Sequence, residues 1–557
     1  MSFLGKKWII QNQDGGLDVV TKLLKNRNLN SEEEQHLFFE SGLESLYDPF
    51  LFKDMKKAVD RIRQAIDKKE KIMVFGDYDV DGITSTVILY DFLKRVGANV
   101  DYTIPNREKD GYGLKDYFIK QFKDDGIDLI ITVDCGIANS NEVKLANEMG
   151  LEVIITDHHD VPEELPPAYA VIDSKQKDCK YPNKDISGSG VAYKLVSALA
   201  PYYFDGNLAQ NYLNKQLGMA VLGLVADCMP LTGENRILTK HGLVSLEQTD
   251  HPGINALIKS AGVADKKITS MTIGFYLGPR INAAGRLDTA RHAFELLLGD
   301  AKKVSTLSKL NTQRQKIVEE FVNEAKAMVE ELGEVPNIIV IKSPKWHVGT
   351  LGLVAGKICD YFHRPTIAMQ ERDNELVASC RSLNNFDITS FLRKEADDLF
   401  SAFGGHKLAG GFTLPKENFD EFLKRIKKAS VNCINPDEFN DILEVDCEIQ
   451  SHELTHETSK RISKLEPFGN GNPEPTLMIK NMKISSIKPV GKKGEHLQFP
   501  VKYGEKKVQA IAFRFGEHLD KINPESEYDI AFNLEINEWN GWKKLQMRVV
   551  DMKQSNQ

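Results

Sequence analysis

The sequence lacks a disulfide framework and lacks any segment long enough to cross a membrane. Its seven cysteines are odd in number and scattered without a CxxC pair, which argues against disulfide stapling and against a thiolate zinc site. No apolar run approaches the ~20 residues that a membrane-spanning helix requires. The residues after Met1 also lack the apolar core of a signal peptide. We therefore expect a soluble protein located in the cytoplasm, with no membrane contact.

The chain also lacks a strong excess of one charge. A net charge of −8 over 557 residues does not indicate a nucleic-acid binder, although a local basic channel would suffice for one. At ~150 residues per domain, this length predicts several domains. The expected fold class is a multidomain α/β protein with two α/β lobes joined by a long helix, plus a C-terminal OB-like β-barrel. The expected segments are a helical N-terminal arm (1–55), a catalytic domain (56–300), a connector helix (301–333), a substrate-binding domain (334–432), a linker (433–475) and the barrel (476–557).

Three aspartates crowd a turn near the start of the first lobe. Asp77, Asp79 and Asp81 alternate between a short apolar strand and an amphipathic helix. One Asp would satisfy the helix N-terminus, whereas three neighbouring carboxylates are costly unless a cation neutralises them. The turn therefore predicts a divalent-metal site.

Ligand-type side chains also follow the next apolar strands and one helix. Asp134 follows 128–133, and Asp157, His158 and His159 follow 153–156. Because the carboxyl ends of parallel strands meet at one edge of a sheet, we expect these side chains to share a site with the acidic turn. Asp227, at the end of an apolar helix, adds a last carboxylate. Carboxylates with few His and no Cys favour two Mn²⁺ or Mg²⁺ ions for in-line phosphoryl displacement.

Arginines and glycine-rich segments between these motifs suit a phosphodiester substrate. Arg reads phosphate oxygens in a bidentate fashion, and paired glycines let backbone N–H groups approach phosphates closely. We expect the segment 278–288 to be a flexible turn and the segment 404–412 to be a glycine-rich loop. The candidate substrate-binding residues are Arg107, Arg280, Arg286, His347, Ser379, Arg381, Gly405 and His406.

The last part of the chain combines basic residues with aromatics. Between Lys480 and Arg514 there are nine Lys or Arg residues against two Glu. Aromatic side chains interleave with short strands and offer stacking platforms for single-stranded nucleic acid. These aromatics are Phe499, Tyr503, Phe513, Phe515, Trp539 and Trp542.

The motifs GDYDVDG, TVDCG, TDHHD and VADCMPL resemble those of the DHH phosphoesterases. The second lobe resembles the DHHA1 domain of that superfamily. With the LEPFGNGNPEP linker and the OB-like tail, nearly the whole chain resembles the RecJ exonuclease family. The resemblance implies metal ligation by Asp79, Asp81, Asp134, His158 and Asp227, with Asp134 as the bridge.

The resemblance further assigns catalytic roles and a reaction. His159 would meet the scissile phosphate, and Asp157 would orient a neighbouring His. The implied reaction is metal-dependent 5′-to-3′ hydrolysis of single-stranded DNA in recombination and repair. The implied partners, beyond the DNA, are a single-strand-binding protein and a helicase, with the enzyme a monomer. One departure is Phe75, where several relatives have a His, so that Asp77 or water would have to compensate.

Three alternatives stay open at this stage. A hydrolase of oligoribonucleotides or cyclic dinucleotides would act on very short RNA and would not need residues 476–557. A family II inorganic pyrophosphatase shares the metal lobe but would leave the β tail idle. An inactive replication-fork scaffold would have lost metal ligands, whereas the Asp and His set here is intact.

Overall fold

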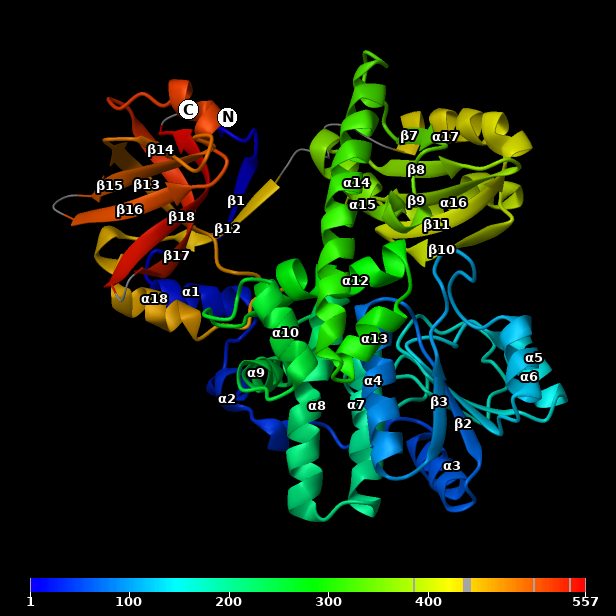
Figure 1. Ribbon diagram of the computed structural model, residues 1–557. Coiled ribbons are helices and arrows are strands. Elements are labelled where there is room, and N and C mark those ends of the chain that lie inside the picture. The colour runs from blue at the N-terminus through cyan, green and yellow to red at the C-terminus, as the bar shows by residue number, and fades with distance from the viewer. Residues whose placement is uncertain (1, 384–385, 434–441, 504–505, 540–541, 556–557) are drawn as a thin grey trace. The chain divides into compact units, whose positions relative to one another are not determined.

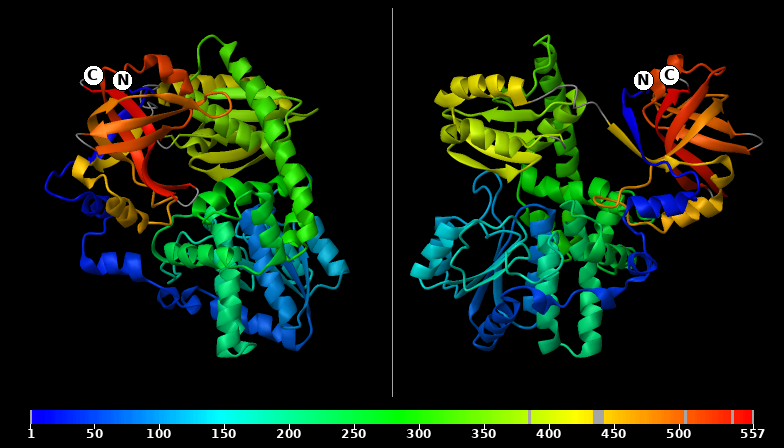
Figure 2. Two further views of the ribbon diagram at one scale, coloured as in Figure 1. Left: turned by 60° about the vertical axis from the view of Figure 1, so that its left-hand side comes forward. Right: turned by 180° about the vertical axis from the view of Figure 1, so that it is seen from behind.

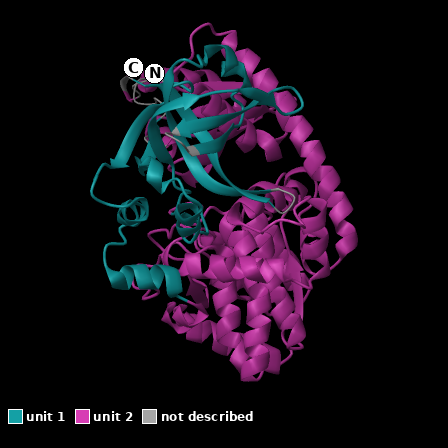
Figure 3. Ribbon diagram, turned by 90° about the vertical axis from the view of Figure 1, so that its left-hand side faces the viewer, with its two compact units in different colours: residues 1–41, 437–468, 472–557 teal, residues 42–436, 469–471 magenta. Residues whose placement is uncertain are grey.

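The computed structural model describes residues 2–383, 386–433, 442–503, 506–539 and 542–555. The chain divides into two compact units, which Figure 3 colours separately. One unit holds both α/β lobes and consists of residues 42–436 and 469–471. The other is the β-rich unit of residues 1–41, 437–468 and 472–557. The expected fold class, two α/β lobes and a C-terminal β domain, is confirmed.

The first lobe is built on a parallel sheet of five strands in the order β3-β2-β4-β5-β6. The strands are β2 (Lys71–Phe75), β3 (Asn99–Thr103), β4 (Leu129–Val133), β5 (Glu152–Thr156) and β6 (Ala170–Ile172). The three central strands are buried on both faces, which is why they read as nearly continuous apolar runs. Helices pack on both faces of the sheet (Figure 1). The strand ends that carry acidic residues therefore lie at one edge.

Helices make up the rest of the first lobe. They are α3 (Met55–Asp67), α4 (Val80–Arg95), α5 (Asp116–Asp124), α6 (Ser140–Glu148), α7 (Gly188–Leu199), α8 (Gly206–Ala226), α9 (Gly233–Glu247), α10 (Pro252–Ser260), α11 (Ser270–Thr272), a π-helical turn (Ile273–Leu277), α12 (Gly278–Leu287) and α13 (Arg291–Leu297). The expectation of a flexible turn at 278–288 was wrong, because α12 occupies it. Pro279 lies in the first turn of α12, where a missing N–H costs nothing.

A single long helix, α14 (Val304–Glu330), takes part in both lobes of this unit. Near its N-terminus, Leu307 belongs to the core of the first lobe. Further along, Phe321 and Ala325 belong to the core of the second lobe. The two views of Figure 2 follow this helix between the lobes.

The second lobe has a mixed sheet of five strands in the order β10-β11-β9-β8-β7. Its elements are β7 (Ile339–Ser343), α15 (Val348–Phe362), β8 (Thr366–Glu371), β9 (Glu375–Arg381), α16 (Ile388–Ala396), β10 (Ala402–His406), β11 (Ala409–Pro415) and α17 (Phe419–Cys433). The segment expected as a glycine-rich loop is instead the hairpin β10–β11, in which His406 pairs with Ala409. His406 is thus placed at the tip of a hairpin.

The β-rich unit has an eight-stranded sheet in the order β1-β12-β13-β17-β18-β16-β15-β14, with an additional pairing of β13 and β15. Its elements are β1 (Lys7–Asn12), α1 (Val19–Asn26), α2 (Glu32–Glu40), β12 (Ile442–Glu448), α18 (His456–Ser463), β13 (Leu477–Ile484), β14 (Lys488–Val490), β15 (His496–Tyr503), β16 (Lys506–Ala512), β17 (Glu527–Trp539) and β18 (Trp542–Gln554). The segment expected as a linker therefore contains a strand and a helix.

The N-terminal segment belongs to this β-rich unit, and the expectation of a helical arm on the next domain was wrong. β1 pairs in parallel with β12, with Lys7 opposite Ile442. Val20 and Leu23 of α1 lie in the core that the C-terminal strands form. The first 41 residues thus complete a domain whose other strands lie more than 400 residues away in sequence. Among the described residues, no helix is long and apolar enough to cross a membrane.

Candidate functional site

The acidic turn is held by two helix N-termini. Asp79 is the N-cap of α4, and its Oδ1 accepts a hydrogen bond from Gly82 N at 3.0 Å. Asp81 accepts hydrogen bonds from the N–H groups of Gly188 (2.6 Å) and Ser189 (3.0 Å), which open α7. Helix N-termini favour negative charge, so these contacts fix two of the three carboxylates.

The predicted ligands of the first lobe come together at the edge of the sheet. Ligand atoms lie within 4.8 Å of one another in three groups. The groups are Asp77, Asp79 and Asp134; Asp81, His158 and Asp227; and Asp134, His158 and His159. The first two groups share no residue, and the third group links them because it contains Asp134 and His158. This arrangement suits a pair of cations.

The electrostatics of this cluster fit a cation. Burial, and then the charges of Asp81 and Asp79, raise the pKa of Asp134 well above its usual range. Burial and the same two charges raise the pKa of Asp227 to about 8. Asp134 Oδ1, Asp77 Oδ1 and His158 Nε2 are buried without a hydrogen-bond partner among the described residues. Unpaired buried carboxylates are unfavourable, and a divalent cation would both partner and neutralise them.

Asp157 and His159 form a separate pair beside the cluster. Asp157 Oδ1 lies 2.7 Å from His159 Nδ1, and Asp157 Oδ2 accepts a hydrogen bond from Ile137 N. Burial opposes the charge on His159, but the contact with Asp157 outweighs it and raises the pKa of His159 to about 9. Against the effect of burial, His159 lowers the pKa of Asp157 to about 2. The pair is therefore ionic at neutral pH.

Phe75 does not face the cluster. Its side chain is fully buried and packs in T-shaped contacts on Phe118 and Phe122. Asp77 instead groups with Asp79 and Asp134, and burial followed by the charge of Asp79 raises its pKa well above the usual range. Asp77 is thus placed, together with Asp79 and Asp134, as a candidate ligand of one cation.

Near the cluster lie arginines that form no ion pair with a carboxylate among the described residues, although the charge of Asp79 acts on Arg286. Burial first, and then the charges of Arg107, Arg314 and Arg381, lower the pKa of Arg286 to about 9. Arg286 Nη1 donates to Gly349 O (2.8 Å), and Arg107 lies 5.0 Å from the centre of the Tyr78 ring. Guanidinium groups that lie close together repel one another electrostatically, and this repulsion favours the binding of an anion.

Arg280 donates hydrogen bonds to main-chain carbonyl groups of Tyr276 and Ser260. Its Nη1 donates to Tyr276 O at 2.6 Å, in the π-helical turn. Its Nε is buried without a partner among the described residues, as is the Nε of Arg314. The charge of Arg280 lowers the pKa of Arg314, after burial. Arg314 thus connects Arg280 electrostatically to Arg286.

The predicted residues of the second lobe meet the first lobe at two points. The His406 ring stacks on His159 with centroids 6.2 Å apart, and its Nδ1 lies 3.4 Å from Asp160. His347, the N-cap of α15, lies 3.5 Å from Glu108 through Nε2. His406 is therefore adjacent to the metal cluster.

Three further predicted residues lie on strands of the second lobe. Ser379 and Arg381 are on β9, and Gly405 is on β10. Arg381 Nη1 lies 3.3 Å from Ser379 Oγ and donates to Cys380 O at 2.7 Å. Gly405 has a φ of +151°, and a Cβ there would lie 2.4 Å from Gly410 Cα. Only glycine fits this close pairing of β10 and β11.

Known protein families match three parts of the chain. The DHH family N-terminal domain matches residues 71–226, the DHHA1 domain matches 335–432, and the RecJ OB domain matches 445–551. The chain is 37% identical over 540 residues to the single-stranded-DNA-specific exonuclease RecJ of Bacillus subtilis, covering 96% of this chain and 67% of that protein. It is 33% identical to the RecJ of Escherichia coli, covering 95% of this chain and 94% of that protein. The chain belongs to the RecJ family.

A solved RecJ structure shares the fold over the full length. The RecJ of Thermus thermophilus in complex with Mn²⁺ has a TM-score of 0.83 at 27% identity, covering 100% of this chain and 80% of that one. The same RecJ in complex with Mg²⁺ has a TM-score of 0.77 at 25% identity, covering 99% and 79%.

Two residues near this RecJ-type site escaped the sequence analysis. Tyr112 lies with its hydroxyl 3.2 Å from His159 Nδ1 and donates to Asp134 O at 3.3 Å. Its place between Gly111 and Gly113 was a usable signal. Arg314 lies on α14, where its charge looked like an ordinary polar position of an amphipathic helix.

Of the six aromatic residues expected to stack on bases in the RecJ OB region, two are buried and two are exposed. Phe499 and Phe515 are buried in the domain core and are unavailable for stacking. Phe513 and Trp542 are exposed, Trp542 by 74%. The side chains of Tyr503 and Trp539 lie outside the described residues.

Proposed function

We propose that this protein is a metal-dependent exonuclease that hydrolyses single-stranded DNA from the 5′ end, in DNA recombination and repair. The observation that carries the proposal is the carboxylate and His cluster, beside which lie arginines that form no ion pair within the described part of the chain. The RecJ relatives are named single-stranded-DNA-specific exonucleases. The direction of digestion and the pathway follow from the family resemblance. In this proposal, residues 56–300 form the catalytic domain and residues 334–432 bind substrate.

Two groups of side chains would hold the two cations, Mn²⁺ or Mg²⁺. Asp77, Asp79 and Asp134 would hold one, and Asp81, His158 and Asp227 the other. When bound, such ions lower the pKa of a bound water and polarise the phosphate. The RecJ structures with Mn²⁺ and Mg²⁺ support this choice of ions.

The protein's own groups then supply charge and orientation. Because Nδ1 of His159 is held by Asp157, the ring is protonated at neutral pH and its Nε2–H is free to donate to a phosphate oxygen. A fixed donor of this kind stabilises negative charge that develops in the transition state. Tyr112 limits rotation of the same ring.

The arginines would bind the phosphates of the strand. The charges of Arg107 and Arg381 lower the pKa of Arg286, and the charge of Arg107 lowers that of Arg381, so a bound anion would stabilise the charged forms of Arg286 and Arg381. Arg381 and Ser379 would contact a terminal phosphate, with His406 beside His159 on the opposite side. Arg280 and Arg314 would meet nucleotides further along the strand. Location in the cytoplasm, a monomeric state, a single-strand-binding protein and a helicase as partners stay predictions.

The test is digestion of 5′-labelled and 3′-labelled single-stranded DNA with Mn²⁺ or Mg²⁺. We expect early release of the 5′ label as a mononucleotide and no cleavage in EDTA. Early loss of the 3′ label would contradict the polarity. Faster cleavage of short RNA or pyrophosphate than of DNA would replace the proposed substrate by one of the alternatives. Deleting the C-terminal strands is a poor test, because it would also expose Val20 and Leu23 of α1.

A further inference from the structure

A lysine that the sequence analysis did not single out lies at the edge of the sheet that carries the metal cluster. Lys175 is three residues beyond the end of β6, where Ile172 O accepts a hydrogen bond from Asp157 N at 3.0 Å. The backbone N–H of Lys175 donates to Asp173 Oδ1 at 2.7 Å, which fixes the residue in its segment. The Lys175 side chain is 30% exposed, so a ligand in solution can reach it.

The charge of Lys175 acts on the metal cluster. Burial and the charges of two neighbouring aspartates raise the pKa of Asp227, and the charges of His159 and Lys175 oppose that rise. Lys175 therefore adds positive charge on the side of the cluster where Asp227 lies.

Lys175 shares one carboxylate with a histidine of the second lobe. Lys175 Nζ lies 2.9 Å from Asp160 Oδ1, and His406 Nδ1 lies 3.4 Å from Asp160 Oδ2. Within the described part of the chain, neither Lys175 nor His406 forms an ion pair with another carboxylate. The two oxygens of Asp160 are therefore held by separate groups, one from each lobe.

This arrangement resembles the binding of a phosphodiester. A phosphodiester also presents two non-bridging anionic oxygens, and Lys binds phosphate as a point charge. The side chain of Asp160 is 73% exposed and that of His406 is 60% exposed, so Asp160 can turn into solvent and leave both donors to a ligand. Exposed ion pairs contribute little to stability, so the exchange of this carboxylate for a phosphate costs little.

The shared carboxylate lies next to the group that would meet the scissile phosphate. The His406 ring stacks on His159, with centroids 6.2 Å apart and planes 14° apart. We propose that Lys175 and His406 together bind the phosphodiester next to the scissile one, and that Asp160 occupies this Lys175–His406 site when no strand is bound. The identity of the ligand as a DNA strand rests on the proposed function.

The experiment measures binding of a fluorescein-labelled oligothymidylate to the full-length protein in EDTA, by anisotropy, over a series of salt concentrations. Without divalent cations the strand is expected to stay intact, and the salt dependence reports the number of phosphate contacts. Lys175→Met removes the charge from a side chain of similar length. Asp160→Asn removes the competing carboxylate and keeps the shape of the side chain. Lys175→Arg restores a positive charge.

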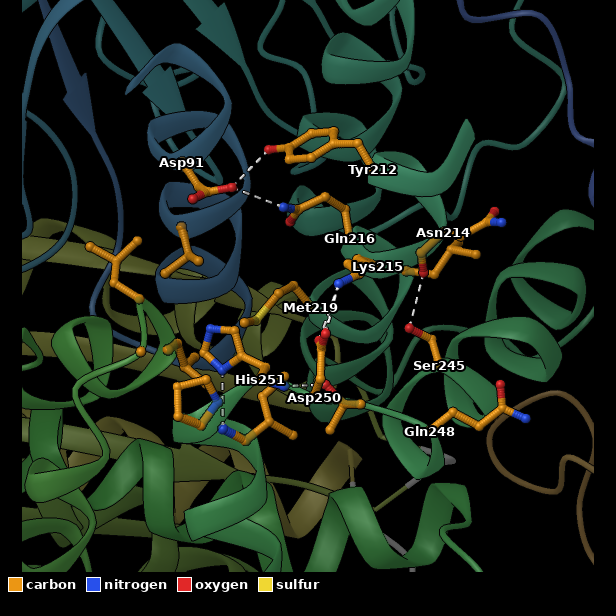
Figure 4. Close-up of a pocket in the computed structure, with 18 of the residues that line it drawn as sticks. Asp91, Tyr212, Asn214, Lys215, Gln216, Met219, Ser245, Gln248, Asp250 and His251 are labelled. Atoms are coloured by element: carbon orange, nitrogen blue, oxygen red, sulfur yellow. Dashed lines mark hydrogen bonds and ion pairs between the residues drawn. The ribbon is translucent and has the colours of Figure 1, made fainter. Parts of the chain in front are cut away.

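Three variants serve as matched controls. Lys53 Nζ lies 2.7 Å from Asp178, with side chains 34% and 68% exposed, and this pair holds the same segment between β6 and α7. Lys53→Met and Asp178→Asn therefore change the same charges in the same segment. Lys215 on α8 pairs with Asp250 at 2.9 Å in a pocket that no metal-ligand candidate lines (Figure 4). Lys215→Met thus removes one positive charge away from the cluster.

We expect Lys175→Met to bind the strand about tenfold more weakly than the wild type, because one charge-assisted hydrogen bond is lost. The slope of log affinity against log salt should become shallower by about 0.7, the value for one phosphate contact of a single strand. Asp160→Asn should bind about two- to fivefold more tightly, because an exposed ion pair no longer competes with the strand. Lys175→Arg should keep most of the affinity, since a guanidinium also binds phosphate. The three controls should keep the wild-type affinity and slope.

Two results would overturn the proposal. One is a loss of affinity in Lys175→Met that is no greater than in Lys53→Met. The other is unchanged or weaker binding by Asp160→Asn, because an ion pair that only stabilises the fold would weaken binding when either member is replaced. Binding is read without cleavage, so a protein that binds in the expected pattern but releases the 3′ label first would refute only the proposed function.

Discussion

Nε2 of His158 lies 3.0 Å from Oδ1 of Asp134, and both atoms are buried without a hydrogen-bond partner among the described residues. Burial first lowers the pKa of His158 to about 4, so this ring is neutral at physiological pH. A neutral imidazole nitrogen and a carboxylate oxygen are both common ligands of divalent cations. The contact therefore joins the first ligand group, which contains Asp134, to the second ligand group, which contains His158.

Replacing Asp134 by Asn tests that junction. Asp134 has a φ of +60°, which Asn tolerates better than Ala, so Asp134→Asn keeps the backbone. We expect a loss of cleavage of at least about 10- to 100-fold, because replacing even the hydrogen-bond partners of metal ligands typically costs that much. Single-stranded DNA binding should survive, because the arginines remain. Mn²⁺ should raise the melting temperature of the wild type and have a smaller effect on the variant. Wild-type cleavage rates in the variant would disprove the role of Asp134.

Stability without divalent cations should depend on pH in a defined direction. Asp227 has a raised pKa of about 8 against 3.8, and His159 one of about 9 against 6.5. Between neutral pH and about pH 9 the folded chain therefore binds more protons than the unfolded chain, and the free energy of unfolding falls as pH rises. Urea unfolding in EDTA at the two ends of this range measures the effect. Asp227→Asn should flatten the dependence, and an unfolding free energy that increases with pH would contradict it.

Gly188 should be essential although it has no functional group. A Cβ at this position would lie 2.5 Å from Asp134 Oδ1, so Gly188→Ala must displace that carboxylate. The matched control is Gly206→Ala, because Gly206 also opens a helix but has open space around it. We expect loss of cleavage and of Mn²⁺ stabilisation for the first variant only, with unchanged circular dichroism. Equal activity of both variants would be inconsistent with this packing.

The N-terminal segment should stabilise the β-rich unit. Leu23 of α1 is fully buried in its core, and Leu→Ala in such a position costs about 2–5 kcal/mol. Leu37→Ala on α2 is the control, since Leu37 is 56% exposed. Denaturant unfolding followed by circular dichroism should show the loss for Leu23→Ala alone. Identical unfolding curves would place the segment elsewhere.

The exposed indole of Trp542 should bind a base of the DNA. Stacking contributes ~1–3 kcal/mol per base, so Trp542→Ala should weaken single-stranded DNA binding by about 5- to 150-fold. Ile9→Ala, an exposed position of the same unit, is the control. Fluorescence anisotropy with an end-labelled oligonucleotide gives both affinities. If Trp542→Ala binds as tightly as Ile9→Ala, the strand follows another surface.

Local sequence signals were sufficient to predict that the candidate metal ligands lie close together. Each predicted ligand follows a strand or ends a helix, and a parallel sheet brings such positions to one edge whatever the intervening loops do. Asp134 and Asp227 illustrate this, because they meet His158 from different elements. The fold class was predictable for the same reason, since apolar strands alternate with amphipathic helices.

Contacts that depend on distant residues were not predictable. The pairing of Lys7 with Ile442 leaves no local signal, so β1 and α1 looked like an independent arm. The dipeptide Gly278–Pro279 favoured a turn, whereas tertiary packing extends a helix through it. Gly285 allows that packing, because a Cβ there would lie 2.4 Å from Tyr78 O. Arg314 became significant only through its proximity to Arg280 and Arg286.

The sharing of α14 between two cores has a mechanical consequence. Leu307 anchors the helix in the first lobe, and Phe321 and Ala325 anchor it in the second, with no glycine or proline between them to act as a hinge. The lobes can therefore separate only if about 40 Å of continuous helix bends or slides against its packing. The contact between His406 and His159 is thus held in place by one stiff helix that is anchored in both lobes.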